Sequence, residues 1–364
     1  MTLPVPFVDL HLTDDSDDVR SAIARVIDRA WFVLGPEVEA FEREFAAACG
    51  APHAVGVGNG TDALALIFRA LGIGPGDEVI TTPLSAAYTA LAIVMAGARP
   101  VFADIDPVRL TLDPAAVEHA ITARSAAILP VHLYGQPADM TALATLAERR
   151  GLALVEDCCQ AHLATCAGRP VGTVGAAGAF SFYPTKNLGA LGDGGAVVTR
   201  DAALAARIAR LRNGGQTDRY RHVELGMNSR LDEIQAAILR VRLPRLRART
   251  QERRVLAARY RSLLEGVRID VPPEIDPGHV YHLFPIRSRE RDPLQGRLRA
   301  CGIETLVHYP FAISQQPAFA SAEPGDCPHA VQAAGEVLSL PLYPGMPPQT
   351  ITTVAEAVRK ESSS

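Results

Sequence analysis

Residues 53–82, HAVGVGNGTDALALIFRALGIGPGDEVITT, contain the pattern that decides the fold class. The segment from His53 to Gly58 is typical of a short strand, and residues 60–72 have the apolar content of a buried helix that ends at Gly72. A second strand follows at residues 77–82. A strand, a helix and another strand in this order predict a crossover between parallel strands.

The same alternation continues from about Gly35 to Arg212. We expect further helices at residues 35–50, 85–97, 114–120 and 139–151, and further strands at residues 99–105, 126–133, 152–157 and 179–182. Several of these strands are apolar throughout, which is typical of a sheet covered by helices on both faces. The sequence therefore predicts an α/β protein whose ligands bind beyond the carboxyl ends of the strands.

The pattern changes after about residue 240. Residues 239–254 carry seven arginines, which we interpret as the solvated face of a long helix. A helix that ends at Gly302, a strand at residues 303–310 and a C-terminal helix follow. We expect a large domain over residues 1–240, with an N-terminal arm, and a smaller α+β domain over residues 241–364.

The composition narrows the classes of function. The chain has 364 residues and a net charge of -4, which argues against nucleic acid or an anionic membrane as a partner. The sequence has no run of about 18 apolar residues, so we expect no membrane span. The six cysteines have no C-x-x-C spacing, so we expect neither a metal site nor a redox pair. With no signal peptide in the N-terminal residues, we expect a cytoplasmic protein.

Lys186 follows the expected strand at residues 179–182 and stands among apolar residues, glycines and hydroxyls. It is either an exposed loop lysine or a half-buried amine with a chemical task. A lysine in a dry site has a lowered pKa and attacks carbonyl groups as a neutral amine. Ser181, just before it, is a candidate ligand for a phosphate.

Two further segments lie at the same edge of the sheet. Asp157 ends the strand in VEDCCQAH, where it either caps the next helix or binds a cationic ring nitrogen. The turn GNGTDAL, residues 58–64, is either a plain turn or a phosphate-binding helix start. An acid at a strand end, a phosphate-binding turn and a lysine 29 residues after the acid together suit pyridoxal 5'-phosphate.

Eight segments carry a resemblance over nearly the whole chain: GNGTDAL, GDEVITT, PVHLYGQPADM, EDCCQAH, FSFYPTKNLGALGDGGAVV, LRNGG, NSRLDEIQAAIL and HYP. In this order they resemble the DegT/DnrJ/StrS family of sugar aminotransferases, which depend on pyridoxal phosphate. The resemblance implies the aspartate-aminotransferase-like fold (fold type I), with a mainly parallel seven-stranded sheet in the large domain. It also implies a homodimer with active sites at the interface.

The resemblance assigns roles at the cofactor. It implies that Lys186 carries the internal aldimine, that Asp157 binds the pyridine nitrogen and that Gln160 lies near the ring hydroxyl. The phosphate would be held by Thr61, Asp62 and Ser181, with Asn228 from the partner subunit, and Gly60 would be a further cofactor-binding residue. Many members of the family stack an aromatic residue on the ring where this chain has Ala86; Tyr88 is the nearest aromatic side chain. We interpret Cys158 and Cys159 as small packing groups.

The substrate contacts are expected in regions that the family uses for this purpose. They are His162, Tyr183, Arg230, His308 and Tyr309. If these residues do not contact the substrate, His162 is an ordinary loop histidine, and His308 and Tyr309 form a packed turn. Arg230 either binds a carboxylate or phosphate, or pairs with Asp232 or Glu233.

The expected reaction transfers an amino group from L-glutamate to a nucleotide-linked keto-sugar, so that the product is an amino sugar. Three alternatives remain open at this stage. The chain could act on a free keto-cyclitol with glutamine as donor. It could be a sugar dehydratase, although Lys186 argues against the branch in which histidine replaces the lysine. It could also be a non-catalytic sensor that binds the cofactor or a sugar nucleotide.

Overall fold

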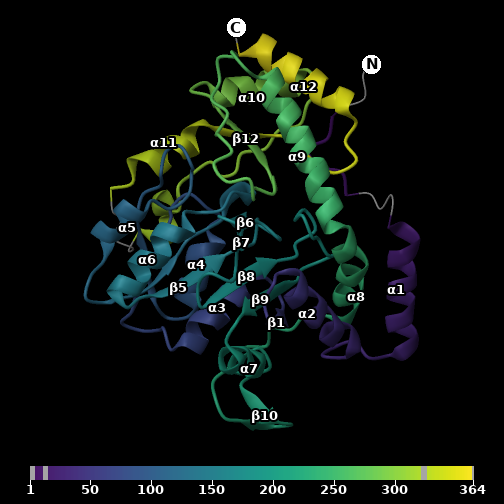
Figure 1. Cartoon of the computed structure of the whole chain (residues 1–364), viewed down its shortest axis with the longest axis vertical. Helices are drawn as coiled ribbons and strands as arrows, with labels where there is room; N and C mark the ends of the chain where they lie inside the picture. The colour runs from purple at the N-terminus through teal and green to yellow at the C-terminus, as the bar shows by residue number, and fades with distance from the viewer. Residues whose placement is uncertain (1–4, 11–14, 321–325, 363–364) are drawn as a thin grey trace.

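The computed structural model describes residues 5–10, 15–320 and 326–362, and its centre is a seven-stranded sheet (Figure 1). The strands follow the order β1-β9-β8-β5-β4-β2-β3. Their bounds are β1 (His53–Val57), β2 (Glu78–Thr81), β3 (Arg99–Phe102), β4 (Ser125–Leu129), β5 (Ala153–Asp157), β8 (Ala177–Ser181) and β9 (Gly195–Thr199). Neighbouring strands are parallel except at β9, which is antiparallel to β1 and β8. The predicted α/β fold with a mainly parallel sheet is confirmed.

The remaining elements surround this sheet or follow it in the chain. The helices are α1 (Ser16–Arg29), α2 (Pro36–Ala48), α3 (Gly60–Leu71), α4 (Tyr88–Met95), α5 (Pro114–Ala120), α6 (Met140–Arg150), α7 (Ala202–Leu211), α8 (Glu233–Arg242), α9 (Leu246–Leu263), α10 (Arg291–Ala300), α11 (Pro328–Glu336) and α12 (Pro348–Glu361). Three two-stranded sheets pair β6 (Thr165–Cys166) with β7 (Arg169–Pro170), β10 (Gln216–Asp218) with β11 (Arg221–His222), and β12 (Phe284–Arg287) with β13 (Val337–Leu340).

Alternate residues of β8 show how both faces of the sheet are covered. Ala177 and Ala179 belong to the apolar cluster that contains α3 and α7. Phe180 and, just beyond the strand, Phe182 belong to the cluster that contains α2 and α8. Because successive side chains of a strand point to opposite faces, one strand supplies both cores.

Three predicted elements are clearly shorter in the structure than expected, and one of them, the strand expected at residues 99–105, ends at Phe102. The strand expected at residues 126–133 ends at Leu129, because Pro130 has no amide hydrogen to continue the ladder. The helix expected at residues 85–97 begins only at Tyr88. Before it the chain turns, and the hydroxyl of Thr82 accepts a hydrogen bond of 3.1 Å from the amide of Leu84.

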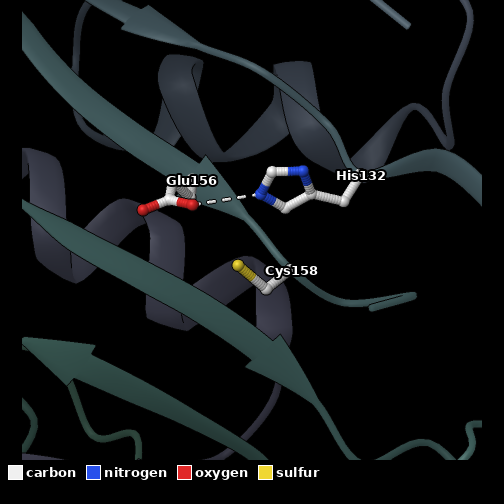
Figure 2. Close-up of side chains that lie close together, drawn as sticks. All are labelled: His132, Glu156 and Cys158. Atoms are coloured by element: carbon white, nitrogen blue, oxygen red, sulfur yellow. Dashed lines mark hydrogen bonds and ion pairs between the residues drawn. The ribbon is translucent and has the colours of Figure 1, made fainter. Parts of the chain in front are cut away.

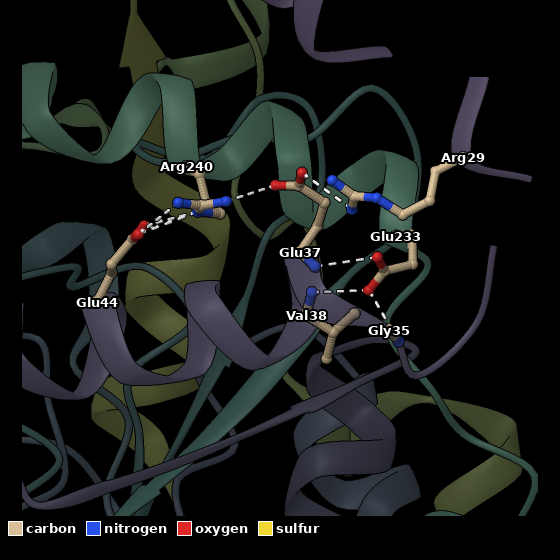
Figure 3. A network of polar contacts seen from close by, with 7 residues as sticks. All are labelled: Arg29, Gly35, Glu37, Val38, Glu44, Glu233 and Arg240. Atoms are coloured by element: carbon tan, nitrogen blue, oxygen red, sulfur yellow. Dashed lines mark hydrogen bonds and ion pairs between the residues drawn. The ribbon is translucent and has the colours of Figure 1, made fainter. Parts of the chain in front are cut away.

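The N-terminus of α2 is capped by an acid from α8 (Figure 3). The buried carboxylate of Glu233 accepts hydrogen bonds from the amides of Gly35, Glu37 and Val38, at 3.0, 3.0 and 2.8 Å. A Cβ atom at residue 35 would lie 2.8 Å from Glu233 Oε2, so a larger residue here would push the carboxylate away from the amides that it accepts. In the same network, Arg240 of α8 bonds Glu37 at 2.6 Å. These contacts fix α8 against the start of α2.

The C-terminal part has its own apolar core, which contains residues of α9, α10, α12, β12 and β13. It lies above the large sheet in Figure 1. The strand expected at residues 303–310 is wrong, since only isolated bridges occur there, from Ile303 to Val5 and from Leu306 to Ser339. The expected boundary between residues 240 and 241 falls inside α8, and the division into two domains remains a prediction.

The arginine-rich stretch is not one helix with a solvated face. Pro244 lies in a 3-10 turn (Leu243–Arg245) that separates α8 from α9. Arg253 is buried, and Arg242 and Arg249 are largely covered and paired with Asp15, each at 3.1 Å. The interpretation of this whole stretch as a solvated face is therefore wrong for these three side chains.

Among the residues described, no helix has the length and apolar character needed to cross a membrane.

Candidate active site

The N-terminus of α3 offers two free backbone donors. The side chain of Asn59 caps the helix by accepting a hydrogen bond of 2.8 Å from the amide of Asp62. Within the described part of the chain, the amides of Gly60 and Thr61 have no hydrogen-bond partner. The carboxylate of Asp62 accepts the hydroxyl of Ser229 at 2.6 Å. Of the predicted phosphate contacts, Gly60 and Thr61 therefore present donors, whereas Asp62 is engaged within the chain.

Gly60 lies where three predicted segments meet. A Cβ atom at this position would be 2.6 Å from Cys159 Sγ and 2.9 Å from Ser181 Cβ. The turn before α3, the segment after β5 and the end of β8 thus converge, as expected for strands that end at the same edge. No side chain larger than hydrogen fits in this cradle without displacing its neighbours.

The carboxylate of Asp157 is held from two sides at the end of β5. Its Oδ2 accepts the hydroxyl of Thr89 at 2.8 Å, and its Oδ1 accepts the amide of Cys159 at 3.1 Å. Ser85 Oγ lies 3.0 Å from Thr89 Oγ1 and completes a chain of hydroxyl groups. Because Thr89 donates to Asp157, Ser85 donates to Thr89. The carboxylate is therefore buried, oriented and supplied with donors.

Lys186 lies in the loop after β8 and is half-buried. Its side-chain amine makes no hydrogen bond or ion pair with the residues that the structure describes. Burial lowers the pKa of Lys186, and the charges of Cys159 and Asp157 oppose this shift. The other lysine of the sequence, Lys360, is exposed on α12. Lys186 is thus the lysine with the environment that the predicted chemistry requires.

Gln160 joins the site to the C-terminal part. Its side chain accepts the amide of Tyr134 at 2.7 Å and donates to the hydroxyl of Tyr309 at 3.0 Å. Burial raises the pKa of Tyr309, and the nearby charge of Asp157 raises it further. His308 donates to or accepts from Ser339 at 3.0 Å, and burial together with the charge of Lys186 lowers its pKa to about 4. His308 and Tyr309 therefore lie beside the predicted cofactor residues.

His162 lies elsewhere than expected. Its side chain has no exposed surface and packs against the rings of Phe180 and Phe182, at 5.6 and 5.8 Å between centroids. Burial, helped by the charge of Lys186 and opposed by the backbone of Ser181, lowers its pKa to about 3. The structure thus places this predicted substrate contact in the apolar core, where a neutral ring fits.

Four other predicted site residues are exposed or partly exposed. The ring of Tyr183 is 52% exposed, Asn228 is exposed, and Ala86 is half-buried. Arg230 donates to the side chain of Asn213 at 3.2 Å and forms no ion pair with Asp232 or Glu233 among the described residues. Tyr88, suggested as a stacking residue, begins α4 with its ring 66% exposed.

A buried trio beside Asp157 has the residue types of a metal site. Figure 2 shows His132, Glu156 and Cys158 close together. The carboxylate of Glu156 accepts the amides of residues 172, 174 and 175 at 2.8, 2.9 and 2.8 Å, and His132 Nε2 lies 3.1 Å from it. His132 Nδ1 accepts the amide of Ala138, so Nε2 carries the proton. The polar atoms of this acid and this histidine are occupied, which indicates a structural role.

Several side chains at the site were not predicted. Thr89 and Ser85 orient Asp157, and the hydroxyl content of TTPLSAAYT was the signal available in the sequence. Tyr134 and His282 carry no such signal, because their partners lie far away along the chain. His282 Nδ1 lies 3.2 Å from the side-chain oxygen of Asn187, the residue after Lys186.

Comparison with known proteins identifies the group to which this arrangement belongs. One relative, from Streptomyces venezuelae, is named dTDP-3-amino-3,4,6-trideoxy-alpha-D-glucose transaminase. It is 50% identical over 364 residues, which cover 98% of this chain and 96% of that protein. The erythromycin biosynthesis sensory transduction protein EryC1 of Saccharopolyspora erythraea is 51% identical over 348 residues, covering 94% and 95%. The crystal structure of S. venezuelae DesV in complex with a ketimine intermediate is 49% identical, with a TM-score of 0.96 and full coverage of both chains.

A comparison of the chain with models of whole protein families agrees with these individual relatives. The model of the DegT/DnrJ/EryC1/StrS aminotransferase family matches residues 13–359. The chain therefore belongs to the DegT/DnrJ/EryC1/StrS aminotransferase family.

Proposed function

We propose that the protein transfers an amino group from L-glutamate to a nucleotide-linked keto-sugar, with pyridoxal 5'-phosphate as its cofactor and as a homodimer. The observation that carries this proposal is the convergence of a lysine with a lowered pKa, an oriented carboxylate and free backbone donors at one edge of the sheet. The name of the Streptomyces relative, a sugar transaminase for a dTDP-linked amino sugar, supports the class of substrate.

The residues present fit this cofactor. The unpartnered amides of Gly60 and Thr61, with the hydroxyl of Ser181 beside them, suit a phosphate. The carboxylate of Asp157 suits a cationic ring nitrogen, and Lys186 suits an aldehyde. When bound there, pyridoxal phosphate supplies an electron sink for a substrate carbon that loses its proton.

Lys186 has the central role among the side chains. Because its pKa is lowered, its amine is neutral at a lower pH than an exposed lysine would be. In this form Lys186 Nζ would take a proton from the substrate carbon as general base, and as general acid it would deliver that proton to the cofactor carbon that is bonded to the amino nitrogen. Thr89 and Cys159 hold the carboxylate of Asp157 in one orientation during the reaction.

The surface of the chain supports the homodimer. On α4, the apolar side chains of Tyr88, Leu91, Val94 and Met95 are between 36% and 66% exposed. A helix with so much exposed apolar surface is typical of an interface. The exposed Asn228 would reach the partner's phosphate site from such a dimer. A cytoplasmic location remains part of the proposal.

A sensor is the second candidate, because the relative from Saccharopolyspora is named a sensory transduction protein. Both functions need cofactor binding, but only the aminotransferase changes the cofactor when it meets an amino donor. The buried and oriented Asp157 and the unpaired Lys186 favour catalysis, since simple binding requires neither a general base nor its lowered pKa.

The absorbance of the cofactor-loaded protein separates the candidates. The proposal predicts that L-glutamate bleaches the cofactor band near neutral pH, that L-glutamine does not, and that a nucleotide keto-sugar restores the band. Bleaching by glutamine with a keto-cyclitol as acceptor would favour the free-cyclitol alternative. A band that neither donor changes would contradict transamination and favour the sensor.

A further inference from the structure

A cavity of about 510 Å³ lies beside the loop that carries Lys186. Its walls come from the N-terminal arm, this loop, the end of α8, the first half of α9 and residues 343–345. The charged side chains on its walls are Asp9, Asp15, Lys186, Arg242, Arg249, Glu252 and Arg253. A space of this size suits a small organic ligand rather than a few water molecules.

Arg253 is the buried cation of this cavity, with only 5% of its surface exposed. One nitrogen, Nη1, donates to the backbone carbonyls of Tyr281, His282 and Leu342, at 3.3, 3.3 and 2.8 Å. The Nε and Nη2 donors have no partner in the described part of the chain, and Arg253 forms no ion pair there. A buried guanidinium normally has a carboxylate partner or another anion, because burial of an unpaired charge is costly.

Two acids on the walls of the cavity, Asp15 and Glu252, have other partners. Asp15 pairs with Arg242 and Arg249, at 3.1 Å each. The carboxylate of Glu252 accepts the amide of Gly345 at 3.0 Å. Burial and the charge of Arg249 lower the pKa of Arg253 to about 10, which leaves it protonated at neutral pH. The guanidinium therefore keeps a positive charge and at least two free donors in a ligand-sized space.

We infer that Arg253 binds an oxyanion of a substrate, a carboxylate or a phosphate, in the cavity beside Lys186. This inference rests on the proposed function, which supplies two sources of the oxyanion. They are the carboxylates of the amino donor and the diphosphate of the sugar nucleotide. The planar fork of an arginine binds either group with two parallel hydrogen bonds. Arg253 thereby positions a substrate with respect to Lys186.

Calorimetry on the cofactor-loaded protein tests the inference with two probes, glutarate and inorganic pyrophosphate. We expect that at least one probe binds and that Arg253→Met weakens its binding at least tenfold. The matched control is Arg291→Met, because Arg291 is also buried and donates through Nη1 to two backbone carbonyls, at 3.4 and 3.3 Å, away from the cavity. This control should bind both probes as the parent protein does.

The outcomes identify the source or overturn the inference. Loss of glutarate binding assigns a carboxylate, and loss of pyrophosphate binding assigns a phosphate. Failure of both probes to bind the parent protein, or equal affinity in Arg253→Met, would refute the site. These measurements need no turnover, so a protein that binds a probe through Arg253 but ignores glutamate would contradict only the proposed function.

A second variant covers the case in which Arg253→Met does not fold. Leu191 lines the same cavity and is 43% exposed, so substitutions there spare the core. Leu191→Glu adds a negative charge beside the ligand and should weaken the bound probe several-fold relative to Leu191→Gln. Equal affinity in these two variants would count against an anion in this cavity.

Discussion

Thr89 donates its hydroxyl to Asp157 over 2.8 Å, and through this bond the first turn of α4 orients the carboxylate at the end of β5. The bond joins residues that are 68 positions apart in the chain.

Replacement of Thr89 by valine should impair the reaction without unfolding the protein. The variant removes one donor to a buried carboxylate, and hydrogen bonds to charged groups contribute about 1.5–3 kcal/mol. We expect kcat/KM to fall by about 10- to 100-fold, because 1.4 kcal/mol corresponds to a factor of ten. Thr89→Ser keeps the hydroxyl and should retain most of the activity; equal kinetics for the valine and serine variants would argue against this role.

Gly60→Ala should weaken cofactor binding. The new methyl group would meet Cys159 Sγ at 2.6 Å and Ser181 Cβ at 2.9 Å, so the phosphate cradle must open. We expect the dissociation constant for pyridoxal phosphate to rise at least tenfold in a fluorescence titration. The control is Gly296→Ala in α10, where no atom lies within 4 Å of the added carbon; it should leave this constant unchanged and stabilise the helix by about 1 kcal/mol.

The sequence predicts the site residues that lie near strand ends, but it does not predict those whose role depends on a contact with a residue far away along the chain. Lys186, Asp157 and Gly60 are predictable because each lies at the end of a strand or a few residues after it, so the fold alone brings them to one edge. Thr89 was missed because its role depends on the precise start of α4, and a pattern defines such boundaries poorly. The packing of the His162 ring is not predictable, because its distance from Asp157 along the chain does not show which face the ring packs against.

His162 should make stability depend on pH. Its pKa is about 3 in the folded protein and about 6.5 in the unfolded chain, so the unfolded state binds more protons between these values. The contribution is fully present above pH 6.5 and is lost as the pH falls toward 3. Between pH 7 and pH 5 this residue should lower the free energy of unfolding by about 2 kcal/mol.

Chemical denaturation at the two pH values checks this prediction. His162→Leu removes the titrating group and should lose less stability than the parent protein on acidification. His329→Gln, at an exposed position, should behave like the parent protein. The same loss in the leucine variant as in the parent would show that other groups cause the acid sensitivity.

Glu233→Gln should destabilise the large domain. The carboxylate accepts three buried amides at the N-terminus of α2, and an amide side chain would turn donors toward some of them. We expect a loss of about 2–3 kcal/mol in the free energy of unfolding. Glu39→Gln, on the exposed side of the same helix, should change stability by less than about 0.5 kcal/mol.

The chain has only two lysines, which allows a direct test of the central claim that Lys186 is the residue that binds the cofactor covalently. The protein is saturated with pyridoxal 5'-phosphate, reduced with borohydride, digested and analysed by mass spectrometry. The account predicts a pyridoxyl group on Lys186, its disappearance in Lys186→Arg together with all activity, and an unchanged result in Lys360→Arg. An unmodified Lys186 in saturated protein, or full activity of Lys186→Arg, would contradict the account.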